Sequence, residues 1–251
     1  MSELLIRKTG KTLGSADEWL QEAPPPAEAA PWEAGQAEFE LARALFRVPG
    51  KALVPDELQA LLASHSGLGP LRLVQGIPGY LVRLDDQPGG SQRCDLLGVV
   101  NGREGRGAVV IEAWSDGGFG PKISDQLKRS RPGSQWAQRI GRLCEAVLGR
   151  SAAASGSLLG GLIHRAAAAL RAAEGEKAAV AVLVFYEFRR KDGRGQQRKG
   201  NLTAIDALVT ALGGEPLKDG VLSGPFRVPG GGEIPASVPL FIGRAVRLLP
   251  E

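Results

Sequence analysis

The segment at residues 178–188, AAVAVLVFYEF, restricts the fold more than any other feature of the sequence. It is apolar almost throughout and rich in β-branched and aromatic side chains. A strand with this pattern is buried on both faces, as in the centre of an α/β sheet covered by helices. No apolar run in the chain reaches the roughly 18 residues that a membrane-spanning helix needs. We therefore expect this segment to be a central strand of a protein core.

The elements predicted around this strand alternate between helices and strands. Their patterns predict helices at 36–46, 55–63, 122–129, 135–148, 158–173 and 202–212, and strands at 71–74, 79–84, 93–100, 107–114 and 238–249. The turns DDQPGG and NGREGR connect three of these strands into a β-meander over residues 80–116. The order predicts a mixed α/β sheet with helices packed on it.

Composition and charge limit the broad class of protein. The chain has 251 residues, of which 43% are hydrophobic, and its formal net charge is +4. The hydrophobic content is sufficient for a folded core. The positive charge permits a polyanionic partner but does not require one. Cys94 and Cys144 lack zinc-site spacing, and the N-terminus lacks the apolar stretch of a secretory signal. We expect a cytoplasmic protein with an N-terminal extension or linker at 1–35, Pro/Ala/Glu-rich in its second half, and one domain at 36–251.

Two carboxylates fall on adjacent strands of the meander. If the turn spans residues 101–106, Val100 lies opposite Gly107, and the same antiparallel register sets Asp95 opposite Glu112. Opposed residues have Cβ atoms about 4.5–5.5 Å apart on one face of the sheet. A register slip, or a bulge at Gly98, would separate them.

A carboxylate pair among Leu, Val and Ile side chains is costly unless something neutralises it. Hard oxygen ligands suit Mg²⁺ or Mn²⁺, and such an ion is able to activate water against a phosphodiester. We therefore expect Asp95 and Glu112 to be metal ligands. The alternative is that Asp95 makes a turn-side hydrogen bond and Glu112 lies at the solvated end of its strand.

The meander resembles the core of the PD-(D/E)xK, or restriction-endonuclease-like, superfamily. Asp95 matches the superfamily's Asp, and Glu112 matches its Glu. More closely, the chain resembles a bacterial family with this core whose function is not established. Its matching residues here are Gly89, Gly90, Ser91, Gln92, Asp95, Glu112, Phe119, Gly120, His164 and Arg165. The resemblance covers residues 37–212 and implies a restriction-endonuclease-like α/β domain with a metal-dependent nuclease activity.

One residue departs from the superfamily pattern. The position of the usual catalytic lysine is Trp114, which has no positive charge and a single hydrogen-bond donor. Either Lys122, in the segment FGPK, supplies the cation from another direction, or the protein binds a metal or nucleic acid without efficient cleavage. Trp114 also fits a plain core aromatic.

Further residues are candidates around this pair. Gln92, Asp116 and His164 are expected to support the site, although a helix-face histidine bonded to a neighbour is the simpler interpretation of His164. Basic residues that are expected to contact nucleic acid are Lys128, Arg129, Arg190 and Lys191. Solvated surface is the simpler interpretation of these charges. The expected partner is DNA or RNA, and no association with a membrane is expected. A homodimer is a further expectation.

Overall fold

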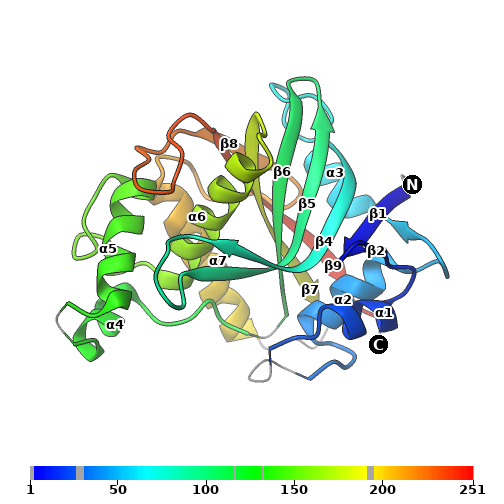
Figure 1. Cartoon of the computed structure of the whole chain (residues 1–251), viewed down its shortest axis with the longest axis horizontal. Coiled ribbons are helices and arrows are strands. Elements are labelled where there is room, and N and C mark those ends of the chain that lie inside the picture. Colours follow the sequence, from blue (N-terminus) through cyan, green and yellow to red (C-terminus); the bar gives the residue numbers. More distant parts are fainter. Residues whose placement is uncertain (1–2, 27–30, 116, 132, 191–194, 251) are drawn as a thin grey trace.

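The computed structural model describes residues 3–26, 31–115, 117–131, 133–190 and 195–250. Within these residues, nine strands form one sheet in the order β2-β1-β4-β5-β6-β7-β9-β8, with β3 paired to β1 (Figure 1). The strands are β1 Glu3–Lys8, β2 Lys11–Thr12, β3 Ala52–Leu53, β4 Arg72–Arg83, β5 Ser91–Gly102, β6 Gly105–Trp114, β7 Val180–Arg189, β8 Leu222–Phe226 and β9 Leu240–Leu248. The helices are α1 Ala16–Glu22, α2 Ala37–Leu45, α3 Asp56–Leu62, α4 Ile123–Arg129, α5 Gln135–Leu148, α6 Gly160–Gly175 and α7 Gly195–Ala211.

The centre of the sheet is the predicted meander followed by two parallel strands. Strands β4, β5 and β6 pair antiparallel, whereas β7 runs parallel to both β6 and β9. The residues of β7 from Val180 to Phe188 are all buried, as the apolar run predicted. The mixed α/β class is confirmed.

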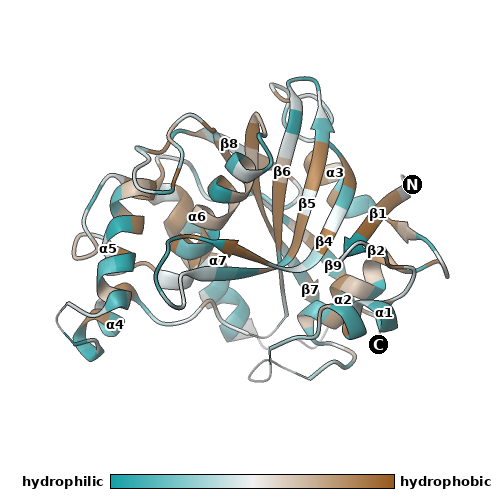
Figure 2. Cartoon of the chain, viewed as in Figure 1, coloured by the Kyte–Doolittle hydropathy of each residue, from teal (hydrophilic) through white to brown (hydrophobic). Residues whose placement is uncertain are grey.

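Side chains on the two faces of the sheet belong to separate hydrophobic clusters. Ala108 and Val110 pack with α5, α6 and α7, whereas Val109 and Ile111 pack with α1, α2 and α3. Figure 1 shows these two groups of helices on opposite sides of the sheet, and Figure 2 shows the hydrophobic colouring of the strands between them. This alternation follows from the two-residue period of a strand.

Helix α6 packs close to the loop after β6. A Cβ atom on Gly161 would lie only 2.4 Å from the carbonyl oxygen of Phe119. Glycine is therefore needed there for the close approach of the helix and the loop. This contact fixes α6 beside the end of β6, where the candidate site lies.

Some elements differ from the sequence predictions. The runs at 71–74 and 79–84 are one strand, β4, which includes Pro78. Among the described residues, β1 pairs with β4 at Gln75 and Gly76 and not at Pro78, so the missing N–H of Pro78 breaks no pair with β1. The helix predicted at 202–212 begins earlier, at Gly195. The first 35 residues add β1, β2 and α1 to the structure, and Trp19 of α1 is fully buried.

Among the described residues, no helix combines the length and the apolar character that crossing a membrane requires.

Candidate functional site

Asp95 and Glu112 lie where strands β5 and β6 separate. The backbone ladder runs from Gly102 opposite Gly105 to Leu96 opposite Ile111, one residue short of the two acids. Val100 lies opposite Gly107, so the predicted register is confirmed along this ladder. Beyond it, the Asp95 side chain replaces the backbone, since its Oδ2 accepts a hydrogen bond from the Ala113 N–H at 2.8 Å.

Glu112 is buried and bound to an arginine from α6. Its side chain is 3% exposed, and its Oε2 accepts a hydrogen bond from Arg165 Nε at 2.7 Å. Burial raises the pKa of the Glu112 carboxyl, and the Arg165 charge opposes that shift. Glu112 Oε1 is buried without a hydrogen-bond partner among the described residues. The alternative of a solvated strand end for Glu112 is wrong, because α6 covers this end of β6 and its Arg165 binds the carboxylate.

Arg165 is itself fixed from several directions. Its Nη1 donates to the Gly161 carbonyl at 3.1 Å, and its guanidinium lies 5.2 Å from the centre of the Phe119 ring. Such a cation–π contact adds to the attraction of the ion pair. The cation beside Glu112 is therefore held in place by the helix and by the loop after β6.

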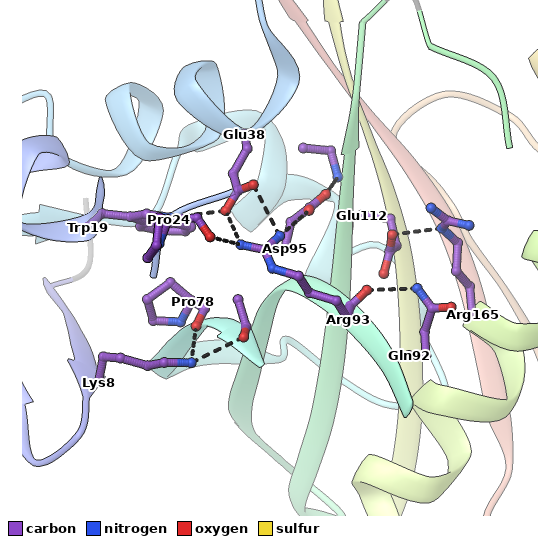
Figure 3. A network of polar contacts seen from close by, with 12 residues as sticks. Lys8, Trp19, Pro24, Glu38, Pro78, Gln92, Arg93, Asp95, Glu112 and Arg165 are labelled. Atoms are coloured by element: carbon purple, nitrogen blue, oxygen red, sulfur yellow. Dashed lines mark hydrogen bonds and ion pairs between the residues drawn. The ribbon is translucent and has the colours of Figure 1, made fainter. Parts of the chain in front are cut away.

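Asp95 faces different partners. Its Oδ1 lies 3.5 Å from Arg93 Nη1, and Arg93 binds Glu38 of α2 through both terminal nitrogens, at 2.6 and 3.1 Å. Burial raises the pKa of Asp95 well above its usual range, and the charges of Glu112 and Glu38 add to this effect. Figure 3 shows Glu112 joined to Arg165, and Asp95 joined to Arg93, which in turn is joined to Glu38. The two carboxylates are neighbours that interact electrostatically but are bound separately.

Trp114, at the superfamily's lysine position, is part of the core. Trp114 is 3% exposed, and its ring packs edge-on against Phe119 at a centroid distance of 6.0 Å. The indole N–H has no hydrogen-bond partner among the described residues. The interpretation of Trp114 as a core aromatic fits this burial.

Lys122 lies apart from the carboxylates. It is the exposed N-cap residue of α4 and lines a pocket of about 590 Å³ with Lys199. Asp95 and Arg165 line a different pocket, of about 200 Å³, next to residues 31–39. The two pockets share the lining residues Gly118 and Phe119. The structure thus brings Arg165, and not Lys122, to Glu112; the catalytic role of Lys122 stays a prediction.

The supporting residues have local partners. The Gln92 amide donates to the Arg93 carbonyl at 2.7 Å, and so supports Arg93 instead of a carboxylate. His164 Nδ1 lies 2.9 Å from the Gly160 carbonyl, and burial lowers the pKa of its imidazole. This geometry matches the simpler interpretation of His164. Asp116 lies outside the described residues.

The predicted nucleic-acid contacts lie on the surface. Lys128 and Arg129 are exposed in the last turn of α4. Arg190 is exposed after β7, and its Nη2 donates to the Ala34 carbonyl at 3.1 Å. Lys191 lies outside the described residues. These positions are compatible with contacts to a polyanion, and their roles stay predictions.

Local sequence patterns do not indicate which groups surround the carboxylate pair. Arg165 is singled out only as one of the residues that match the resembling family, which does not indicate its partner. Arg93 and Glu38 had no distinguishing signal, since Glu38 reads as an ordinary acid in the first turn of a helix. Their contact joins residues 55 positions apart, and local patterns carry no information on it.

The fit of a divalent metal ion follows from these contacts. Glu112 Oε2 is bound to Arg165 and Asp95 Oδ2 to a backbone N–H, which leaves Glu112 Oε1 as the buried oxygen without a partner. Within the described parts of the chain, no group of three or more His, Cys, Asp or Glu side chains is arranged to hold a metal. A guanidinium on a ligand carboxylate repels a second cation. The arrangement therefore does not fit a preformed divalent metal site.

Comparisons with known proteins identify one family. No curated protein and no solved structure matches the chain. Residues 12–247 match the family model described as a domain of unknown function, DUF6946. Because this match spans most of the chain, the protein belongs to the DUF6946 family.

Proposed function

We propose that the protein is a restriction-endonuclease-like module that binds nucleic acid without efficient cleavage. The meander that carries Asp95 and Glu112 is followed along the chain by helix α6 with His164 and Arg165, which is the order of the matching residues on which the resemblance rests. Asp95 and Glu112 also lie together at the strand ends where that resemblance expects its acids. The order of elements and the place of the acids support the fold assignment.

The ion pair between Arg165 and Glu112 carries the proposal that cleavage is inefficient. A metal ion at Glu112 would have to displace a guanidinium at 2.7 Å that is also bound to Gly161 and packed on Phe119. Freeing one partner of a buried pair costs about 3–5 kcal/mol. Trp114 adds no charge with which to hold a phosphate.

The exposed basic residues around α4 and α7 support the proposal of nucleic-acid binding. These residues are Lys122, Lys128, Arg129, Arg131, Arg190 and Lys199. None of them forms an ion pair with an acid among the described residues, so their charges are available to phosphates. The binding would be electrostatic and sensitive to salt.

Fluorescence anisotropy with short single- and double-stranded DNA, measured over a range of salt concentrations, tests the proposal. The double variant Lys128→Ala/Arg129→Ala is expected to weaken binding and to reduce the slope of log K against log salt by about 2 for duplex DNA, since each contact contributes about 0.9. The matched control is Lys51→Ala/Arg72→Ala, which removes one exposed lysine and one exposed arginine elsewhere. Equal losses in both double variants would refute a specific role for α4.

The second candidate function is Mg²⁺- or Mn²⁺-dependent cleavage. The observation that favours cleavage is that the buried Oε1 of Glu112 has no hydrogen-bond partner among the described residues, so this oxygen is available to another ligand. Incubation of plasmid with either ion, beside Asp95→Ala, separates the two functions. Cleavage by the natural protein and none by the variant would replace the first proposal with the second.

A further inference from the structure

The pocket around Lys122 and Lys199 is a candidate binding site distinct from the carboxylate pair. It encloses about 590 Å³ between the loop after β6, residues 157–159 and helix α7. Pockets for small molecules usually span about 300–1,000 Å³. The space is therefore large enough for a nucleotide.

The lining combines apolar and cationic groups. Phe119, Leu158 and Ala207 supply apolar surface, and Lys122 and Lys199 supply two exposed charges. No acid is among the described residues that line the pocket, and neither lysine has an ion-pair partner among them. A ligand that satisfies this lining carries an anionic group joined to an apolar or aromatic body.

Helix α7 forms one wall of the pocket, is held in place by a hydrogen bond, and has a glycine where a side chain would otherwise project. The buried Asn201 donates its amide N–H to the Gly117 carbonyl at 2.7 Å, which ties α7 to the loop after β6. Gly200 lies inside this helix, and a Cβ atom there would meet no atom within 4 Å. Glycine costs about 1 kcal/mol relative to alanine in a helix. Packing does not require it, and its missing side chain leaves space at the pocket.

We propose that this pocket binds a nucleotide, with the phosphate at Lys122 and Lys199 and the base against the apolar wall. Gly118 and Phe119 also line the pocket beside Asp95, so a nucleotide held here would share these two residues with the pocket of the carboxylate pair. The proposal that the pocket binds a free nucleotide does not depend on the proposed function. The proposal that this nucleotide belongs to a bound nucleic-acid strand rests on the proposed function.

Isothermal titration with AMP, dAMP and inorganic phosphate tests the site. Lys122→Ala and Lys199→Ala are each expected to weaken nucleotide binding about tenfold, the loss of one charge-assisted contact. Lys51→Ala is the control for removing an exposed lysine. Gly200→Phe is expected to block the pocket, whereas Gly200→Ala is expected to keep it open. Absence of nucleotide binding by the natural protein, or unchanged binding in both lysine variants, would overturn the proposal.

A competition experiment separates this proposal from the proposed function. If dAMP displaces a single-stranded oligonucleotide, the pocket takes a nucleotide of the strand. If nucleotide binding depends on the two lysines but no DNA binds, the pocket is confirmed for free nucleotides and the proposed function fails. If DNA binds but no nucleotide does, the pocket is refuted and the proposed function is retained.

Discussion

Replacing Arg165 with methionine tests the central ion pair of the site. The substitution keeps an apolar side chain against Phe119 but removes the donor to Glu112 Oε2. Because Oε1 already has no partner among the described residues, both oxygens of a buried carboxylate would then be unsatisfied. The protein should lose stability.

The expected loss follows from the burial of the two partners. Glu112 is 3% exposed, which places it among buried charges, whereas Arg165 is 21% exposed and partly solvated. Breaking a buried pair costs about 3–5 kcal/mol, and partial solvation favours the lower end, about 3 kcal/mol. For a chain of this size, the melting temperature should fall by about 6–12 °C.

Chemical denaturation at neutral pH measures the effect. Arg171→Met is the matched control on the same helix, since Arg171 pairs with Glu233 at the surface, where an ion pair contributes about 0–1 kcal/mol. The double variant Arg165→Met/Glu112→Leu should recover most of the loss, because it removes the unpaired charge as well. A loss in Arg165→Met no larger than in Arg171→Met would refute the reasoning.

Three further predictions concern pH and helix stability. The pKa of Asp95 is raised in the folded protein, so its contribution to stability is present below about pH 3.9 and is lost as pH rises through the folded pKa. The Asp95→Asn variant should therefore gain stability relative to the natural protein as pH rises from acidic to neutral. A pH-independent difference in unfolding free energy between the two proteins in denaturation experiments would contradict this. The pKa of Asp85 is lowered, because hydrogen bonds from Arg139 and the Gln87 N–H outweigh its burial, so its contribution to stability is lost as pH falls through the folded pKa. Asp85→Asn should reduce the unfolding free energy by about 2 kcal/mol at pH 7 and by less below about pH 4. An equal loss in denaturation curves at the two pH values would contradict this. Gly200→Ala should raise the free energy of unfolding by about 0.5–1 kcal/mol, and a decrease in the denaturation midpoint would show a packing need that the open space at this position does not reveal.

The core of the fold was predictable because its signals are local. The alternation along β5 and β6 and the turn between them fix the register that sets Leu96 opposite Ile111. The continuous apolar run of β7 required burial on both faces. By contrast, strand β1 is a short segment whose described residues pair with β4 at Leu5 and Ile6, and its pattern does not specify that partner.

The site was predictable only in part. The neighbouring positions of Asp95 and Glu112 followed from the register, but their partners come from α2 and α6. Arg165 lies 53 residues from Glu112, and only the packing of α6 over β6 brings them together. The sequence predicts α7 only from residue 202, because the glycines and charges of the segment before it favour a turn. In the structure this segment instead forms a wall of the nucleotide pocket.

A single experiment tests the account most directly. The natural protein is mixed with labelled duplex DNA in the presence of Mg²⁺ or Mn²⁺, and binding and strand integrity are measured in the same sample over a range of salt concentrations. We predict that affinity falls steeply with salt while the DNA stays intact. Absence of salt-dependent binding, or cleavage that Asp95→Ala abolishes, would contradict a nuclease-like module that binds without cutting.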